Sequence, residues 1–490
     1  MIQSFLHSLK RNKIFVLINA LFLTIYSLIC FVNHYNFRTY SLDLGIYTRA
    51  VYNYAHFHFN YAEIFKAQKE NILGDHFDPI LIIISPLYYL FGTYVLLVVQ
   101  IAFIHIGAIG VYKVAIQQLQ NKKLALIVMA SFLSFYGILS ALSFDVHTNV
   151  FAATLVPWLF YFFTNSKWKH VFIISALILL CKENMALWLI FIGFGLAWLY
   201  YKEKQKRNFA LIISLVSIIY FVCITMVVMP ALALNASYAH MHYVILGNSF
   251  GEILNNLFKH PLGAVVLLFK NHLADKTFDY YKIETHIFVL LSGGFLVFFK
   301  PQYLLMLVPI YFQKMFHNTS TIWSVGMHYN IEFAPILILC FIAILSSMKS
   351  EKQRLIFSII YLILNVVVTI RLCDHTIGFV DKTRIRFYQA DHYESDFDTK
   401  VVYSCLKKIP TNAIVSAENM FVPHLIDRKM VYQYPIVKNA QYILLSDDIH
   451  SYPLATDIML KQIDSLSSSK NWSLLATNNH VYLFEMIEKH

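Results

Sequence analysis

Carboxylate, imidazole, amide and ammonium groups are concentrated in five short polar segments of an otherwise apolar chain. The segments are 40–47 (YSLDLGIY), 74–79 (GDHFDP), 144–149 (FDVHTN), 182–184 (KEN) and 328–330 (HYN). Side chains of these types can transfer protons, bind anions or hold a divalent cation. Ionisable groups at membrane depth are costly, so by default they mark candidate functional sites.

Several of these residues also have a purely structural interpretation. Asp43 precedes an amphipathic stretch and can be a helix N-cap. Asp75 and His76 can be ordinary loop residues before a helix that begins with proline. Asp145 and His147 are two residues apart, so they can share a proton, bind a metal ion or cap a helix. The residue types alone leave both interpretations open.

The composition assigns most of the chain to a membrane. Of its 490 residues 58% are apolar and 14% are charged, against about 25% charged in an average soluble domain. The mean hydropathy is +0.56. So few charges cannot cover a surface in water, which argues against soluble enzymes, nucleic-acid-binding proteins and disordered scaffolds. The net charge of +11 lies in short loops and therefore indicates membrane topology. We predict a polytopic α-helical membrane protein.

One long apolar stretch, 171–201, is interrupted by Lys182 and Glu183. In a single span each charge would cost about 2.5–3.5 kcal/mol near the membrane centre. Two short helices would place both charges at a tip near one interface, where they can form a local ion pair or bind a ligand. We therefore predict a hairpin here. The other runs that approach the 17–25 residues of a membrane helix lie near 14–32, 93–117, 124–142, 150–164, 208–229, 284–299, 302–316, 331–348 and 355–371.

The basic residues predict the orientation of these spans. The alternate short loops 144–149 and 317–330 contain no Lys or Arg. By the positive-inside rule the chain has eleven spans, with its N-terminus in the cytoplasm and residues after about 372 outside. The first apolar run lacks a small-residue cleavage site and is predicted to be a retained span. The basic clusters lie at 10–13, 122–123, 167–169, 202–207 and 349–354.

The sequence predicts two domains: a transmembrane domain, 1–371, with outer loops 33–78 and 230–283, and a small extracytoplasmic α/β domain, 372–490. Short runs rich in β-branched and aromatic residues predict strands in the second domain. They lie at 413–417, 430–434, 441–445 and 480–486, with helix-like segments near 397–408 and 454–466.

The 230–283 loop contains two stretches, 250–259 and 261–272, that look like amphipathic helices at the membrane interface. Histidines in and beside this loop lack a metal-ligand spacing, and we interpret them as interfacial or structural. They are His240, His242, His260, His272 and His286.

Specific motifs cover nearly the whole chain. They include SLDLGIYTRAVYNYA, NILGDHFDPILIIISPLYYLFGTYVLLVVQ, SFDVHTN, LLCKENMAL, HYNIEFAPIL and IPTNAIVSAENMFVPHLIDRKMVYQYP. Through them the chain resembles the prokaryotic membrane-protein family called domain of unknown function 2079. The architecture of that family is similar to the GT-C glycosyltransferases, which take sugars from polyprenyl-phosphate carriers at the outer face of the plasma (inner) membrane.

The resemblance implies transfer of a hexose or pentose to a glycan, lipid or protein acceptor. Asp43 would be the acidic residue that deprotonates the acceptor hydroxyl, with His76 and Asp145 as further catalytic residues. Lys182 or Arg49 would offset the charge of the lipid phosphate. The implied substrate-binding residues are Arg49, Asp75, His147, Lys182, Glu183 and His328.

A divalent cation is a candidate cofactor, with Asp145, Glu183 and His147 as its implied ligands. The expected partners are the polyprenyl-phosphate-linked sugar, membrane lipid and the acceptor, and no nucleic acid. Two other functions remain open: a non-catalytic factor for envelope assembly or polymer export, and a transporter. Transporters usually show repeats with broken helices in matching positions, whereas the two halves of this chain differ.

Overall fold

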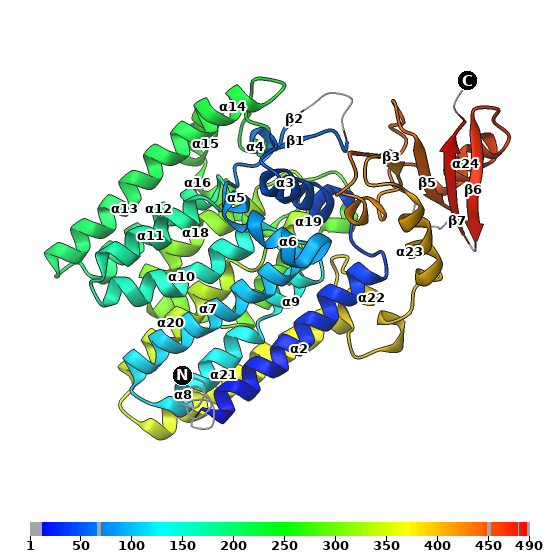
Figure 1. Cartoon of the computed structure of the whole chain (residues 1–490). Coiled ribbons are helices and arrows are strands. Elements are labelled where there is room, and N and C mark those ends of the chain that lie inside the picture. Colours follow the sequence, from blue (N-terminus) through cyan, green and yellow to red (C-terminus); the bar gives the residue numbers. More distant parts are fainter. Residues whose placement is uncertain (1–11, 66–69, 448–451, 479, 488–490) are drawn as a thin grey trace.

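The computed structural model describes residues 12–65, 70–447, 452–478 and 480–487. Helices form a tilted bundle that contains most of the chain, and a small sheet lies beside one end of it (Figure 1). The architecture is that of a mostly helical membrane protein with a small C-terminal sheet. Within the described ranges, four helices are long and apolar enough to cross a membrane: Lys13–Tyr35 (α2), Ile80–Leu119, Lys204–Leu232 and Glu351–Asp374 (α21).

Two of these four helices contain local breaks. Ile80–Leu119 comprises α5, two short 3₁₀ turns, α6 and α7, and the turns occur at Pro86 and at Gly92. Proline lacks an amide hydrogen, and Gly92 has φ +53°, so the regular helical hydrogen bonding is interrupted at both residues. The segments are α5 (Ile80–Ile84), α6 (Tyr88–Phe91), α7 (Val95–Leu119), α13 (Lys204–Cys223) and α14 (Met229–Leu232).

The remaining helices of the bundle are shorter. The predicted hairpin is confirmed, because α11 (Trp168–Leu179) and α12 (Met185–Leu199) are separated by a turn that carries the charges. A bent pair, α8 (Lys122–Leu133) and α9 (Tyr136–Leu142), turns by 43° and can count as a fifth span. Other helices are α10 (Thr148–Thr164), α17 (Tyr281–Leu291), α18 (Pro301–Met315) and α20 (Phe333–Ser347).

Small residues allow these helices to approach one another closely. A Cβ atom at Gly107 of α7 would lie 2.8 Å from the Thr154 side chain of α10. A Cβ atom at Gly193 of α12 would collide with the Ser214 side chain of α13. In a bilayer, close packing of this kind replaces the hydrophobic driving force between helices. The ends of these closely packed helices lie next to the polar segments.

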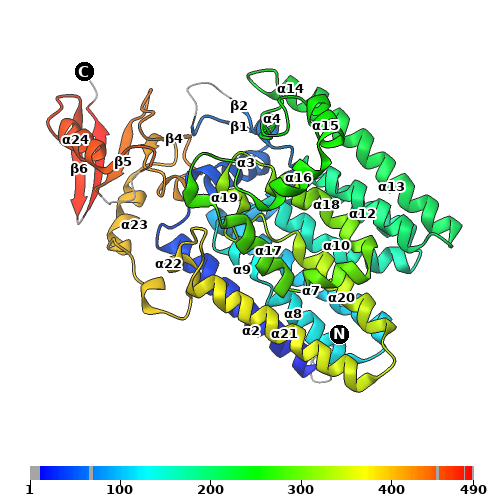
Figure 2. The same cartoon turned by 180° about the vertical axis from the view of Figure 1, so that it is seen from behind.

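The two ends of the bundle differ in character. One end holds the start of α2, the α7–α8 turn and the start of α21 (Figure 1). The opposite end holds the short helix α4 (Ile72–Asp75), α19 (Ser320–Trp323) and the C-terminal sheet (Figures 1 and 2). Basic turns therefore gather at the first end and polar segments at the second.

The C-terminal part contains a five-stranded mixed sheet in the order β4-β3-β5-β7-β6. β4, β3 and β5 are parallel, whereas β7 pairs antiparallel with β5 and β6. The four predicted strands and both predicted helices are confirmed, and β6 is an additional strand. The elements are β3 (Ile414–Ala417), β4 (Met430–Gln433), β5 (Tyr442–Ser446), β6 (Trp472–Asn478), β7 (Val481–Met486), α23 (Thr399–Lys408) and α24 (Thr456–Ser467).

The first long loop joins this sheet to the bundle. Phe37 packs edge-on against Phe421, their ring centroids 5.6 Å apart. Arg49 of α3 (Ile46–Ala55) donates hydrogen bonds to three backbone carbonyls, those of Ile426, Arg428 and Lys429. Phe37 precedes η1 (Ser41–Gly45) and Arg49 follows it, so contacts with the C-terminal part fix the position of η1 at both of its ends.

The 230–283 region forms the two expected helices, α15 (Phe250–Lys259) and α16 (Pro261–Phe269). The Ser249 side chain accepts a hydrogen bond from the Glu252 amide and caps the first helix. Apolar side chains project outward from both, and Phe258 and Leu262 are at least 80% exposed. Such exposure is typical of helices that lie against a membrane surface.

Candidate functional site

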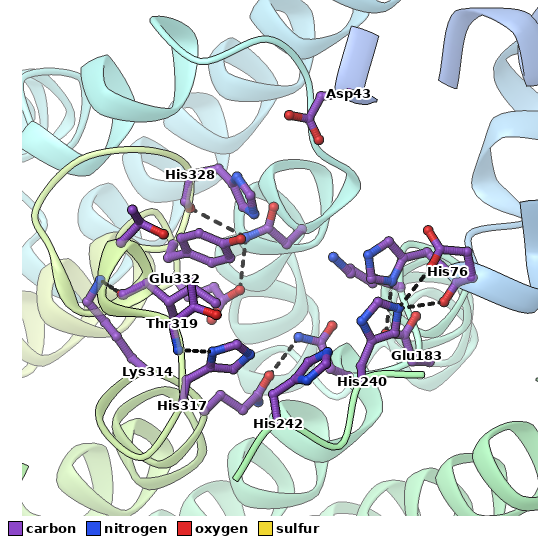
Figure 3. A pocket seen from close by; sticks show the side chains of 18 of the residues that line it. Asp43, His76, Glu183, His240, His242, Lys314, His317, Thr319, His328 and Glu332 are labelled. Carbon is purple, nitrogen blue, oxygen red and sulfur yellow. Dashed lines mark hydrogen bonds and ion pairs between the residues drawn. The ribbon is translucent and has the colours of Figure 1, made fainter. Parts of the chain in front are cut away.

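The polar end of the bundle surrounds a cavity of about 460 Å³. In Figure 3 the labelled side chains ring a common space, with Asp43 on one side and His242 and His317 on the opposite side. The walls come from segments that are far apart in the sequence. These are η1, the end of α4, the turn 182–184, the loop 238–243, the end of α18 and the segment 317–332.

Asp43 contributes a partly exposed carboxylate to this cavity. Its Oδ1 atom lies 3.1 Å from Nε2 of His147, and its side chain is 19% exposed. Burial alone would raise the pKa of Asp43, but the charge and hydrogen bond of His147, aided by Lys182 and Arg384, lower it below its usual value. Asp43 therefore stays ionised, and its side chain caps no helix.

His147 contacts Asp43 but does not itself line the cavity. Its ring stacks on that of His328, with centroids 3.3 Å apart and an interplanar angle of 17°. Burial is the main cause that lowers the pKa of His328 well below its usual value, so this imidazole is neutral. His328 lines the cavity, whereas His147 is not among the lining residues.

Asp145 does not reach the cavity. Its carboxylate is bound by Arg384 of α22 (Lys382–Ile385) at 2.6 Å and accepts the Tyr40 amide hydrogen at 2.9 Å. Asp145 has φ +49°, a left-handed conformation that aims its side chain back at the first loop. The pair fixes the backbone next to Asp43, so Asp145 is a positioning residue and not a group that meets a ligand.

Lys182 and Glu183 lie at the tip of the α11–α12 hairpin and do not pair with each other. Glu183 accepts the Phe77 amide hydrogen at 3.1 Å and lies 3.2 Å from Nδ1 of His76. Burial would raise the pKa of Glu183, but His76 and Lys182 lower it to about 2. Lys182 is 9% exposed and lines the cavity. Within the described part of the chain, its ammonium forms no hydrogen bond or ion pair.

A second group of ionisable side chains forms the wall beside the hairpin. His240 lies 2.7 Å from the main-chain oxygen of Asp75 and 3.5 Å from its carboxylate. The rings of His76 and His240 stack with centroids 4.1 Å apart. Burial, together with Lys182, lowers the pKa of His76 to about 4. The local sequence favours an interfacial or structural role for His240, because nothing in its spacing points to a residue 165 positions earlier.

The far wall contains polar residues to which the sequence assigned no role in the site; of these, His242 was interpreted as interfacial or structural. Lys314 donates hydrogen bonds to the carbonyls of Ile322 and Ser324, so its charge is already satisfied. Glu332 accepts a hydrogen bond from Asn149 at 3.0 Å. His242 and His317 complete this wall. Lys314, His317 and Glu332 lie near the end of an apolar stretch, which was the only signal that could have identified them.

The structure thus divides the sequence-predicted residues into three groups. His147 lies behind the cavity wall, and Asp145 and Arg49 are engaged in structural contacts. The cation ligands implied by the resemblance do not come together, since Asp145 pairs with Arg384 and Glu183 with His76. Six predicted residues line the cavity: Asp43, Asp75, His76, Lys182, Glu183 and His328.

A bundle of apolar helices with a polar cavity at one end defines a polytopic membrane protein with a candidate ligand site. The chain belongs to the family described as "Predicted membrane protein (DUF2079)", domain of unknown function 2079, which matches residues 33–483. The resemblance seen in the sequence motifs is therefore confirmed. No curated protein matches the chain.

Proposed function

We propose that this protein is a GT-C-type membrane glycosyltransferase that moves a sugar from a polyprenyl-phosphate carrier to an acceptor hydroxyl. One observation carries the proposal: the same cavity holds an ionised carboxylate, Asp43, and an ammonium group, Lys182, that forms no hydrogen bond or ion pair with any described residue. A glycosyl transfer that releases a lipid phosphate needs both a proton acceptor and a cation.

In the proposed reaction the acceptor oxygen attacks the anomeric carbon of the sugar. The acceptor O–H proton passes to Asp43, and a new C–O bond forms. The bond between the anomeric carbon and the phosphate oxygen breaks, and its electron pair leaves with the polyprenyl phosphate. Lys182 stabilises the negative charge that develops on this leaving group, since a fixed cation in a largely desolvated site acts strongly on it.

The proposed orientation places the cavity at the outer membrane face. The basic turns gather at the end of the bundle opposite the cavity (Figure 1), and basic loops stay in the cytoplasm. In this arrangement eleven spans, several of them short, make up the domain 1–371. The N-terminus is cytoplasmic, and the domain 372–490 lies outside. The exposed apolar faces of α15 and α16 support an interfacial position for the 230–283 region.

The test uses full-length purified protein and labelled polyprenyl-phosphate sugars with lipid, glycan and protein acceptors. Transfer or hydrolysis that is lost in Asp43→Asn but kept in Asp391→Asn supports the proposal. Asp391 is the matched control, because it is an exposed acid outside the cavity. Substrate-dependent flux in liposomes without transfer would favour a transporter. Neither activity would favour an assembly or export factor.

A further inference from the structure

The geometry points to a metal site in the wall of the cavity: Asp75, His76 and His240 together bind one divalent transition-metal ion of the zinc class. The site differs from the cation ligands that the family resemblance implies. It needs no sugar donor and does not rest on the proposed transferase activity.

Three potential ligand atoms converge at this point. One nitrogen of each imidazole and one carboxylate oxygen of Asp75 lie within 4.8 Å of one another. Zinc–ligand bonds of about 2.0–2.2 Å place neighbouring ligand atoms roughly 3.3 Å apart in a tetrahedron. To close the group around an ion, the three atoms must move closer together, and the His240 ring must turn out of its parallel stack on His76. Two ligands come from the end of the first loop and the third from the 238–243 loop.

Glu183 completes the arrangement that metal-binding histidines usually have. It lies 3.2 Å from Nδ1 of His76, so the other ring nitrogen, Nε2, remains for an ion. The Glu183 side chain is 1% exposed, and its second oxygen accepts the Phe77 amide hydrogen. A buried carboxylate in this position fixes the ring and makes its second nitrogen a better ligand.

The donor set indicates which ions fit. Two imidazoles and one carboxylate are the ligands of catalytic zinc and of related transition metals, whereas magnesium and calcium prefer oxygen ligands. Three protein ligands leave at least one coordination position open. Because the side chains of Asp75 and His240 are 45% and 26% exposed, an ion can enter from the cavity side.

The charges around the group also favour a cation. Asp75 and Glu183 contribute two carboxylates, against the single ammonium of Lys182 nearby. A divalent ion converts this net negative wall into a net positive one. Lys182 lines the same cavity as the three ligands, so a bound ion would add to the positive charge that an anionic ligand meets there.

Full-length protein without a polyhistidine tag tests the proposal. It is stripped of metal and titrated separately with Co²⁺, Zn²⁺ and Mg²⁺, and Co²⁺ binding is followed by its visible absorption. We expect one equivalent of Co²⁺ or Zn²⁺ and much weaker Mg²⁺ binding. His240→Ala and Asp75→Asn should weaken binding by more than about 100-fold, and Glu183→Gln by about 10–100-fold.

His242→Ala is the matched control. His242 lies two positions from His240, lines the same cavity and is outside the group, so its loss should leave affinity near that of the wild type. Circular dichroism and size-exclusion profiles check that each variant is folded. Binding below one equivalent, preference for Mg²⁺, or equal effects of His240→Ala and His242→Ala would each overturn the proposal. Metal binding without sugar transfer would remove only the proposed function.

Discussion

Two acids from different loops approach each other at the polar end of the bundle and have opposite surroundings. Asp43 lies beside His147, lines the cavity and is 19% exposed. Asp145 is 1% exposed and pairs with Arg384, which lies 239 residues later in the chain. Each acid directly follows an apolar or aromatic residue in a short polar segment, so their residue contexts look alike. A distant arginine makes one of them structural and leaves the other available to a ligand.

The largest effect that separates the two acids is on catalysis. Asp43→Asn should lower the rate of sugar transfer by about 10²–10⁴-fold, because the amide cannot take the acceptor proton. Its thermal midpoint should stay near that of the wild type. Transfer rates with labelled donor and thermal unfolding in detergent measure both quantities. Near-wild-type transfer by this variant would remove Asp43 from the mechanism.

The structural role of Asp145 is tested by replacing its partner, Arg384. Arg384→Met leaves the Asp145 carboxylate buried without a cationic partner and should cost about 3–5 kcal/mol of stability. Adding Asp145→Leu should restore part of the loss, since two apolar groups need no partner. Thermal unfolding measures both, with Arg386→Met as the partly exposed control. No recovery in the double variant would show that the pair does more than neutralise charge.

A change at Lys182 tests whether this residue stabilises the phosphate leaving group. Lys182→Met should slow transfer by about 10²–10³-fold, the usual cost of losing one group that stabilises transition-state charge. Lys202→Met, at an exposed position in the α12–α13 turn, is the control. An unchanged rate in Lys182→Met, measured with saturating donor, would contradict its assignment to the phosphate.

The smallest predicted effect is a shift in pH dependence. The lowered pKa of Asp43 keeps the carboxylate ionised below the usual range of an aspartate, so transfer should persist until the pH falls through that lowered value. His147→Gln removes the main source of the lowering, so the acidic limb of the rate profile should move to higher pH. Superimposable profiles for the two proteins would show that His147 does not tune Asp43.

The sequence predicts the local elements of this fold well and its long-range pairs poorly. The charged tip at 182–184 predicts the hairpin, because two charges inside one span would be costly. β6 was missed, since Trp472–Asn478 is partly exposed and mixes polar with apolar residues. Among the described residues, four helices, or five with the bent pair, have the length and composition of a membrane span, and four further apolar helices have only 10–17 residues.

In the candidate site, too, the sequence predicts the local polar segments but not the long-range pairs. Four of the five polar segments bring six of the predicted residues to one cavity, because helix ends at the same side of a bundle must meet there. Arg384 and His240 were not identified. Arg384 lies in a polar stretch that resembles its neighbours, and His240 lies in a loop with several other histidines. Only the folded chain brings these two residues to Asp145 and Asp75.

Chemical rescue tests the contrast between the two acids most directly. Asp43→Ala opens space beside a cavity of about 460 Å³, so added formate can reach the vacated position and accept the proton. We predict that formate restores transfer in Asp43→Ala, in proportion to its concentration, and has no effect on Asp145→Ala. Equal rescue of both variants, or rescue of Asp145→Ala alone, would contradict the assignment of Asp43 as the proton acceptor.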